Sequence, residues 1–260
     1  MVTRRLPNGA AVLVRENHAS EVVTVQAWVR DGPLYESADE RGAAFVLSGI
    51  VFDSSPKYPA GEMASAIEAV GGRISASSTH DYTQYGITLS SEHLELALDV
   101  MMEGLANASF DAGRVEAQKR TVIDGLAWAY DQAIERAHWL CLGAAHGDHP
   151  YGLPPQGTDE LIERLTHAEV RDHYRQHYVG ENTTIVIVGS VDADETAARA
   201  AEVFGGLRSG APAVPRPSPE NWTPTRGPTV RADVRKAYQV VAFPAPSIDD
   251  PDNIVMDIIL

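Results

Sequence analysis

The chain has 260 residues and a formal net charge of −15 at pH 7, with 44% hydrophobic and 22% charged residues. These proportions are typical of a soluble globular protein with one or two domains. The negative charge argues against binding to nucleic acid or to an anionic membrane surface. No apolar run is long enough to predict a transmembrane helix.

The chain contains a single cysteine, Cys141. One cysteine excludes an internal disulfide and fits a reducing compartment, so we expect a cytoplasmic protein. The apolar neighbours of Cys141 indicate a core thiol rather than a reactive one. The N-terminal residues are basic, but no apolar segment follows them, and this is not the pattern of a secretory signal.

Residue patterns predict alternating strands and helices over the first 206 residues. The pair Asn8-Gly9 is a turn signal that would join the first strand to the second. Strands are expected where β-branched residues concentrate, at 10–16, 22–30, 73–78, 82–89 and 183–189. Helices are expected at 40–52, 61–70, 92–107, 111–130, 132–145, 193–204 and from a capping box at Thr166 to near Tyr178.

The run Gly42–Phe52 reads G-A-A-F-V-L-S-G-I-V-F, and the similar frame continues through Lys57–Glu62 and Ile67–Gly72. It resembles the pitrilysin/insulinase (M16) zinc peptidases, which include the mitochondrial processing peptidases. That family carries G-L-A-H-F-L-E-H-M-L-F on a helix here. Further similarities follow in the same order, among them H-P-Y-G at 149–152, as far as about Gly206. Each similarity alone is weak evidence for the family, but their occurrence in the same order along the chain is specific.

The resemblance implies an α+β fold of the M16/LuxS-like metallohydrolase half-domain type, with a mixed, mostly antiparallel sheet packed with helices. It divides the chain into a half-domain at 1–206, a linker at 207–228 and the start of a second half-domain at 229–260. Six of the 16 prolines lie in the linker. We expect strands at 229–234 and 237–243 and then a helix that begins at the acidic run around Pro251. Because family members continue with a complete second half, we expect a truncated chain; a natural single-half protein is the alternative.

The zinc motif of the family is missing from this frame. A gapless comparison places the two ligand histidines on Phe45 and Gly49 and the general-base glutamate on Ser48. Two histidines four residues apart share one helix face and can hold a zinc ion, while the glutamate takes a proton from zinc-bound water. Phe45 and Gly49 offer no lone pair, and a serine hydroxyl is a poor base near neutral pH.

The third ligand is missing as well. The family places a glutamate on a later helix, in a context such as R-Q-V-V-L-E-E, and the matching run here is Lys119–Gly125. The ligand position falls on Gly125, and an upstream acidic position falls on Gln118. Asp124 is one residue away and would point about 100° around the helix. A wrong register is the alternative, but no His-x-x-Glu-His or His-Glu-x-x-His occurs anywhere in the chain.

Two other features are candidate sites. The strand at 73–78 lies where family enzymes hold substrate as an added β-strand, through main-chain hydrogen bonds to residues such as Ser75, Ala76 and Ser77. An ordinary edge strand is the alternative. The spacing of His173 and His177 can bind zinc, and His146 lies near His149. We interpret both pairs as surface histidines, because the first matches F-Y-R-R-Y-Y at a metal-free helix end in relatives.

The resemblance therefore implies a non-catalytic subunit of a heterodimeric M16 zinc endopeptidase. Such a chain has no metal or cofactor of its own and completes the peptide-binding chamber of an active partner. The partner carries His-x-x-Glu-His and the zinc, and the shared substrate is a peptide. Two alternatives stay open: a scaffold or interaction protein without a proteolytic role, and an active zinc peptidase that uses surrogate ligands such as Asp124 or the histidine pairs.

Overall fold

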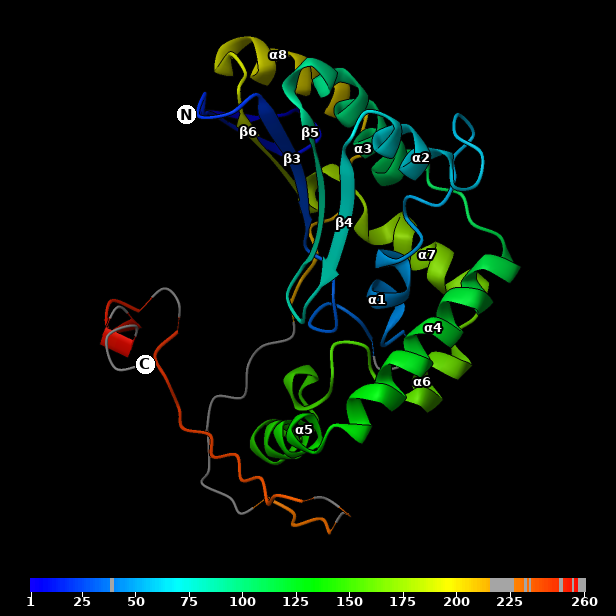
Figure 1. The fold of residues 1–260 in the computed structure, drawn as a ribbon, viewed down its shortest axis with the longest axis vertical. Helices are drawn as coiled ribbons and strands as arrows, with labels where there is room; N and C mark the ends of the chain where they lie inside the picture. Colours follow the sequence, from blue (N-terminus) through cyan, green and yellow to red (C-terminus); the bar gives the residue numbers. More distant parts are fainter. Residues whose placement is uncertain are drawn as a thin grey trace.

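A mixed six-stranded sheet forms the centre of the structure, which is a computed structural model (Figure 1). The residues described are 1–37, 40–215, 227–231, 233, 235–247, 250–253 and 255–256. The strands are β1 (Val2–Arg5), β2 (Ala11–Glu16), β3 (Val22–Val29), β4 (Arg73–Ser78), β5 (Thr83–Ser90) and β6 (Thr183–Gly189). Their order in the sheet is β1-β2-β6-β3-β5-β4.

Strand directions confirm the predicted fold class. β2 and β6 run parallel, whereas the other four neighbouring pairs are antiparallel. The Asn8-Gly9 turn joins β1 to β2, although the residue patterns had assigned no range to β1. β4 forms one edge of the sheet, which leaves one side of its backbone without a partner strand.

The helices of the described residues follow the predicted order. They are α1 (Ala43–Ser48), α2 (Glu62–Ala69), α3 (Leu94–Asn107), α4 (Ala112–Asp131), α5 (Ala133–His146), α6 (Asp159–Arg164), α7 (His167–His177) and α8 (Ala193–Phe204), with short 3₁₀ turns η1 (Ser91–His93), η2 (Pro150–Gly152) and η3 (Gly180–Asn182). No described helix is both long and apolar enough to cross a membrane.

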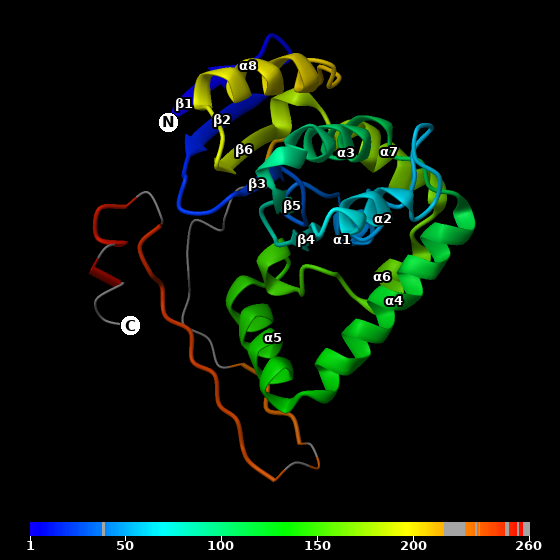
Figure 2. The ribbon, with the colours of Figure 1, turned by 45° about the horizontal axis from the view of Figure 1, so that its top comes forward.

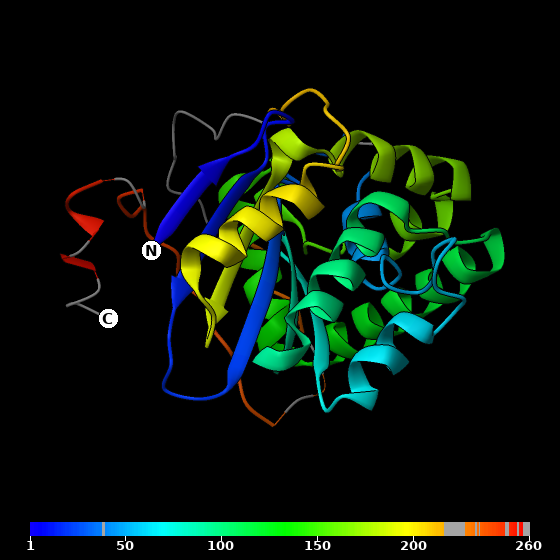
Figure 3. The same ribbon diagram turned by 90° about the horizontal axis from the view of Figure 1, so that it is seen from above.

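Helices cover one face of the sheet. Alternate residues of the strands are buried toward them, for example Val23, Val25, Ala27 and Val29 of β3, because side chains alternate between the faces of a strand. α8 packs on β1 and β2, α3 packs on β3 and β5, and α3 and α8 lie side by side across the sheet (Figure 3). Helix α7 packs against α1 and α4.

Helix α5 is set off from the sheet at the far end of α4 (Figure 2). The β4–β5 hairpin and the segment after α5 are joined by two hydrogen bonds: Nε2 of His80 to the Leu153 carbonyl at 2.8 Å, and the Tyr151 hydroxyl to Asp81 at 2.5 Å. No residue of α5 is fully buried, so Cys141 is half-buried and the predicted core position is wrong.

Two local predictions at helix starts need correction, and a third is confirmed. The first helix begins at Ala43 and ends at Ser48, because Gly42 adopts a left-handed conformation and Gly49 terminates the helix. The helix expected at 92–107 opens with the 3₁₀ turn η1, and α3 itself begins at Leu94. The capping box of Thr166 with Glu169 is confirmed at the start of α7.

The predicted strands at 229–234 and 237–243 are not formed by the described residues of those ranges. Val241 and Phe243 are exposed there. An isolated strand pair is marginal without a third strand or a helix to pack on, and these residues have neither. Of the expected final helix, Asn253, Val255 and Met256 are helical, and residues 257–260 lie outside the described part of the chain.

Candidate functional site

The positions that the resemblance assigns to zinc lie on α1 and α4, which pack against each other. Phe45 is half-buried and packs against the hydrophobic core. Ser48 is half-buried, and its hydroxyl donates to the Phe45 carbonyl at 2.7 Å. The side chain of Phe45 thus serves packing, and the hydroxyl of Ser48 already has a partner within its own helix.

Gly49 and Gln118 come together although they are far apart in sequence. A Cβ atom built on Gly49 would lie 2.1 Å from Nε2 of Gln118, so the amide of Gln118 fills the space that a side chain at position 49 would need. The absence of a side chain at position 49 and the presence of a long one at 118 are therefore complementary. A histidine at position 49 requires the Gln118 side chain to move.

Gly125 lies on the same face of α4 as Gln118, because seven residues span almost two complete helical turns. It is exposed, and a Cβ atom built there would meet nothing within 4 Å. Positions 45, 48, 49, 118 and 125 together offer only two polar side-chain groups, the hydroxyl of Ser48 and the amide of Gln118. Zinc requires imidazole, thiolate or carboxylate ligands, so these residues do not fit the zinc ion that the resemblance implies.

The edge strand β4 is exposed at Ser75, Ala76 and Ser77. Its inner side pairs with β5 in the register Ser75 to Gly86 and Ala76 to Tyr85. The position at the edge of the sheet agrees with the prediction, and the outer backbone groups of β4 are the ones that an added strand would use.

The interpretation of His173 and His177 as surface residues is wrong. Both are buried, with 1% and 4% of their surface exposed. They lie on the inner face of α7 with Val170, Tyr174 and Tyr178, at the i, i+3, i+4, i+7 and i+8 spacing of a buried helix stripe. That spacing was visible in the sequence and predicts burial. His146 and His149 are half-buried and make edge-to-face contacts with Tyr151.

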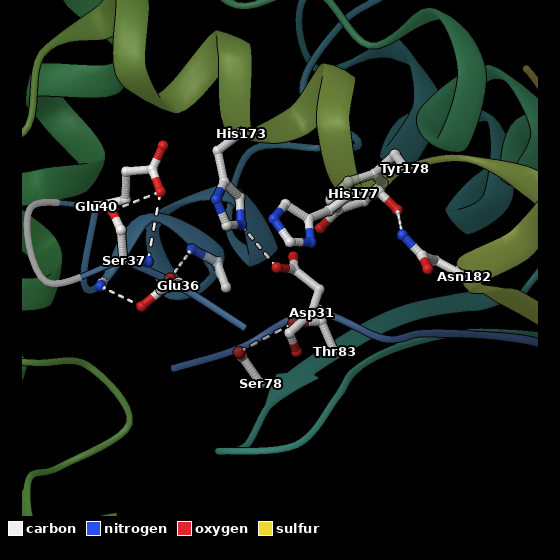
Figure 4. A network of polar contacts seen from close by, with 12 residues as sticks. Asp31, Glu36, Ser37, Glu40, Ser78, Thr83, His173, His177, Tyr178 and Asn182 are labelled. Atoms are coloured by element: carbon white, nitrogen blue, oxygen red, sulfur yellow. Dashed lines mark hydrogen bonds and ion pairs between the residues drawn. The ribbon is translucent and has the colours of Figure 1, made fainter. Parts of the chain in front are cut away.

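The two histidines face Asp31, which follows the end of β3 and is fully buried (Figure 4). Nε2 of His173 lies 2.7 Å from Oδ1 of Asp31. The two imidazole rings stack with their centroids 4.2 Å apart. Sequence patterns gave no signal for Asp31, because its partners lie on a helix more than a hundred residues later.

The pKa values in this cluster reflect burial and charge together. Burial alone would raise the pKa of Asp31, but the charge of His173 holds it below its ordinary value. Burial alone would lower the pKa of His173, but the Asp31 carboxylate holds it above its ordinary value. Burial, and then the charge of His173, lower the pKa of His177. The structure thus favours one charged imidazole, paired with one carboxylate.

Glu36 is a second buried carboxyl group beside this cluster (Figure 4). Its oxygens accept hydrogen bonds of 2.8 Å from the backbone N–H groups of Gly42 and Ala44, at the start of α1. Burial raises the pKa of Glu36 to about 7 in spite of these bonds and of the nearby His173. Glu36 therefore links the geometry of α1 to the protonation of the cluster.

Models of known families match most of the chain. The model of insulinase, peptidase family M16, matches residues 11–150, and that of the peptidase M16 inactive domain matches residues 164–260. An uncharacterized zinc protease of Mycobacterium leprae is 31% identical over 82% of this chain and 48% of its own length. The probable mitochondrial-processing peptidase subunit beta of Arabidopsis thaliana is 23% identical over 96% of this chain and 48% of its own. The chain thus spans about half the length of the curated relatives it matches.

Solved structures share the fold. A protease from Helicobacter pylori has a TM-score of 0.78 at 21% identity and covers 85% of this chain and 54% of that chain. The first half of the periplasmic protease PqqL from Escherichia coli has a TM-score of 0.73 at 22% identity and covers 85% of this chain and 49% of that chain. The insulinase model matches more than half of the sequence, and the strands and helices have the corresponding arrangement. The chain belongs to peptidase family M16.

Proposed function

We propose that this chain is a non-catalytic subunit of a heterodimeric M16 zinc endopeptidase and completes the peptide-binding chamber of an active partner. The observation that carries the proposal is the donor set on α1 and α4. Phe45, Gly49 and Gly125 stand at the ligand positions, and Ser48 stands at the position of the general base. None of these can bind zinc or abstract a proton near neutral pH.

The packing of α1 on α4 supports the proposal further. Gln118 fills the space beside Gly49, and Phe45 packs on the core, so the two helices fit each other without a metal. A recent loss of one ligand would leave the other ligands in place. Replacement at every position, with complementary packing, is what a role without chemistry at this site would produce.

Peptide contact remains available to such a subunit through β4. An extended peptide that pairs with the outer side of β4 would form main-chain hydrogen bonds, and these do not depend on zinc ligands. Ser75, Ala76 and Ser77 are small and exposed, so they leave room for such a strand. The short side chains provide little grip of their own, which favours binding with weak sequence preference.

The partner in this proposal is an M16 subunit that carries His-x-x-Glu-His and supplies the zinc ion. The chain matches about half of the length of its relatives and of the related structures, so a complete chamber needs further protein. We also infer a cytoplasmic location from the single cysteine. Cell fractionation tests this location, and recovery in a periplasmic fraction, where PqqL resides by its name, would contradict it.

Reconstitution tests the function. The full-length protein is purified alone and together with an M16 subunit of the same genome that carries the intact motif, and cleavage of a quenched fluorescent peptide is measured. We expect no chelator-sensitive cleavage by the lone chain and an increase in the partner's activity on mixing. Chelator-sensitive cleavage by the lone chain would refute the non-catalytic role. Absence of any gain on mixing would favour a scaffold instead.

Two comparisons sharpen the test. A substrate with alternate backbone nitrogens methylated cannot pair as a strand, so we expect it to lose the gain that this chain confers. The second comparison is a variant that restores the motif, F45H/S48E/G49H/G125E, with Q118A to clear the space beside position 49. This variant should gain zinc at the face formed by Phe45, Ser48, Gly49, Gln118 and Gly125, called the α1–α4 face below. Q118A alone should not gain zinc.

A further inference from the structure

The cluster formed by Asp31, His173 and His177, called the α7 cluster below, gathers three side chains of the kinds that bind transition metals. One ligand atom from each residue lies within 4.8 Å of the others. Among the described residues this is the one group of three or more histidine, cysteine or acidic side chains with such geometry. His173 and His177 lie one helical turn apart on α7, and Asp31 approaches from the end of β3.

Hydrogen bonding within the α7 cluster is incomplete. Oδ2 of Asp31 and the Nδ1 atoms of both histidines are buried and have no hydrogen-bond partner among the described residues. Buried polar atoms in folded proteins are nearly always paired, since each orphan is costly. Oδ2 of Asp31 is an unpaired acceptor beside two imidazoles, and this points to a missing ligand between the three residues.

Charge gives the sign of that ligand. Asp31 and Glu36 place two carboxyl groups beside two imidazoles. Outside α7, the described acidic residues that act electrostatically on His173 are Asp31, Glu36 and Glu40. Without a cation, a proton on His173 is the nearest positive charge available to Asp31. A divalent ion would neutralise the Asp31 carboxylate and leave both imidazoles neutral, which is the form that coordinates metal.

We propose that Asp31, His173 and His177 form a structural binding site for a divalent transition metal of the zinc class. Two imidazole nitrogens and one carboxylate oxygen suit zinc, cobalt and nickel and are too few and too nitrogen-rich for calcium or magnesium. The ion would take the place of the hydrogen bond between Nε2 of His173 and Oδ1 of Asp31. Metal binding needs neutral imidazole, so it weakens as the pH falls. It would tie the end of β3 to α7.

Burial separates this site from catalysis. The side chains of Asp31 and His173 have no exposed surface, so a peptide carbonyl could not reach an ion held between them. This geometry also argues against the histidine pair as a surrogate catalytic centre. An ion could enter through a pocket of about 430 Å³ that His177 lines together with Tyr35 and Asn182.

Metal titration of the full-length protein tests the site. The protein is prepared without a polyhistidine tag, stripped with a chelator and dialysed, and then titrated with Zn²⁺ or with Co²⁺. We expect one equivalent of zinc by atomic absorption, a rise in the melting temperature, and a visible Co²⁺ spectrum of a site with four or five ligands. A folded wild-type protein that retains no zinc, or shows no thermal shift, would overturn the proposal by itself.

A matched pair of variants locates the ion. His177→Phe keeps an aromatic ring in the core and removes one ligand, and His18→Gln removes an exposed histidine. We expect His177→Phe to weaken zinc binding by more than about 100-fold, because loss of a residue that only supports a ligand typically costs about 10–100-fold. We expect His18→Gln to leave zinc binding unchanged. Equal zinc binding by His177→Phe and wild type would place the ion elsewhere and refute the assignment.

The metal test and the function test are independent. Zinc in the α7 cluster does not make the chain a peptidase, so metal content alone says nothing about catalysis by α1 and α4. A lone chain that binds zinc without cleaving peptide supports both proposals. A lone chain that cleaves peptide and keeps this activity in His177→Phe would refute the non-catalytic role and not the metal site.

Discussion

The α1–α4 face and the α7 cluster lie in the same half-domain, yet they differ in donors and in burial. The α1–α4 face holds the positions that the resemblance assigns to the zinc ligands and the general base, and here they are phenylalanine, serine and glycine. The α7 cluster lies in the core, at positions that match aromatic residues in the related F-Y-R-R-Y-Y segment, and carries two histidines and an aspartate. The positions of a family motif and a metal-binding geometry can thus stand at different places in one fold.

Burial explains why the difference matters energetically. A half-buried polar side chain such as Gln118 can lose a partner at lower cost, because water can replace that partner. The α7 cluster has no water contact at Asp31 or His173, so each of its charges depends on the others. Substitutions should therefore have large effects on the stability of the fold in the cluster and small ones in the α1–α4 face.

The largest expected effect is that of Asp31→Ala. Removal of one partner of a buried pair leaves the other buried and uncompensated, so we expect a loss of about 3–5 kcal/mol in the free energy of unfolding. Urea denaturation in the presence of a chelator measures this loss without any contribution from metal. The exposed control His18→Ala should change stability by less than about 0.5 kcal/mol.

A triple variant sharpens this prediction. In D31V/H173F/H177Y the cluster becomes apolar, and replacement of a buried polar group by packed side chains is often neutral or stabilising by about 1–4 kcal/mol. We expect this variant to recover most of the stability that Asp31→Ala loses and to bind no metal. A triple variant as unstable as the single one would show that the cluster itself holds the fold together.

The next largest effect is the pH dependence that Glu36 contributes. Its pKa is raised from 4.5 to about 7, so the folded protein keeps this proton while the unfolded chain has lost it. Stability should therefore fall as the pH rises from 4.5 to 7, by about 3 kcal/mol at 1.36 kcal/mol per unit, and then level off. Denaturant unfolding at several pH values measures this, with Glu36→Gln as the variant.

The difference between wild type and Glu36→Gln isolates this group from the histidines. His173 has a raised pKa, so its contribution is present below pH 6.5 and lost as the pH rises through the raised value. His177 has a lowered pKa and acts with the opposite sign. Both histidines remain in each protein, so the difference reports the titration of Glu36 together with its electrostatic coupling to His173. Identical pH profiles for the two proteins would contradict the assignment to Glu36.

The smallest effect is expected in the α1–α4 face. Gly49→Ala places a Cβ atom against the amide of Gln118, which is the far end of a flexible side chain and can turn away. A double-mutant cycle of Gly49→Ala with Gln118→Ala should give a coupling energy of about 0.5–1 kcal/mol. A coupling near zero would mean that the two positions do not meet in solution.

Much of the fold could be predicted from the residues because its elements carry local signals. The β-branched runs of β2, β3 and β6 and the capping box of α7 are local patterns, and each was predicted within a few residues. The limits of α1 depended on Gly42, whose left-handed conformation no periodic pattern reveals. The strand pair expected after residue 228 failed because strands need partners that a local pattern does not supply.

The α1–α4 face and the α7 cluster also differ in how far the sequence reveals them. The α1–α4 positions come from comparison with a family motif, and in the structure Gly49 and Gln118 of this set lie beside each other. The α7 cluster was missed because His173 and His177 were interpreted without the buried stripe around them. Asp31 joins them only in three dimensions, so no spacing along the chain could have indicated it.

Anomalous diffraction at the zinc absorption edge tests both halves of the comparison in one measurement. Crystals of the full-length protein grown with zinc should show one strong peak among Asp31, His173 and His177, and no peak between α1 and α4. A peak beside Phe45, Gly49 or Gly125 would contradict the account of an erased zinc site, and the absence of a peak at the α7 cluster would contradict the proposed metal site.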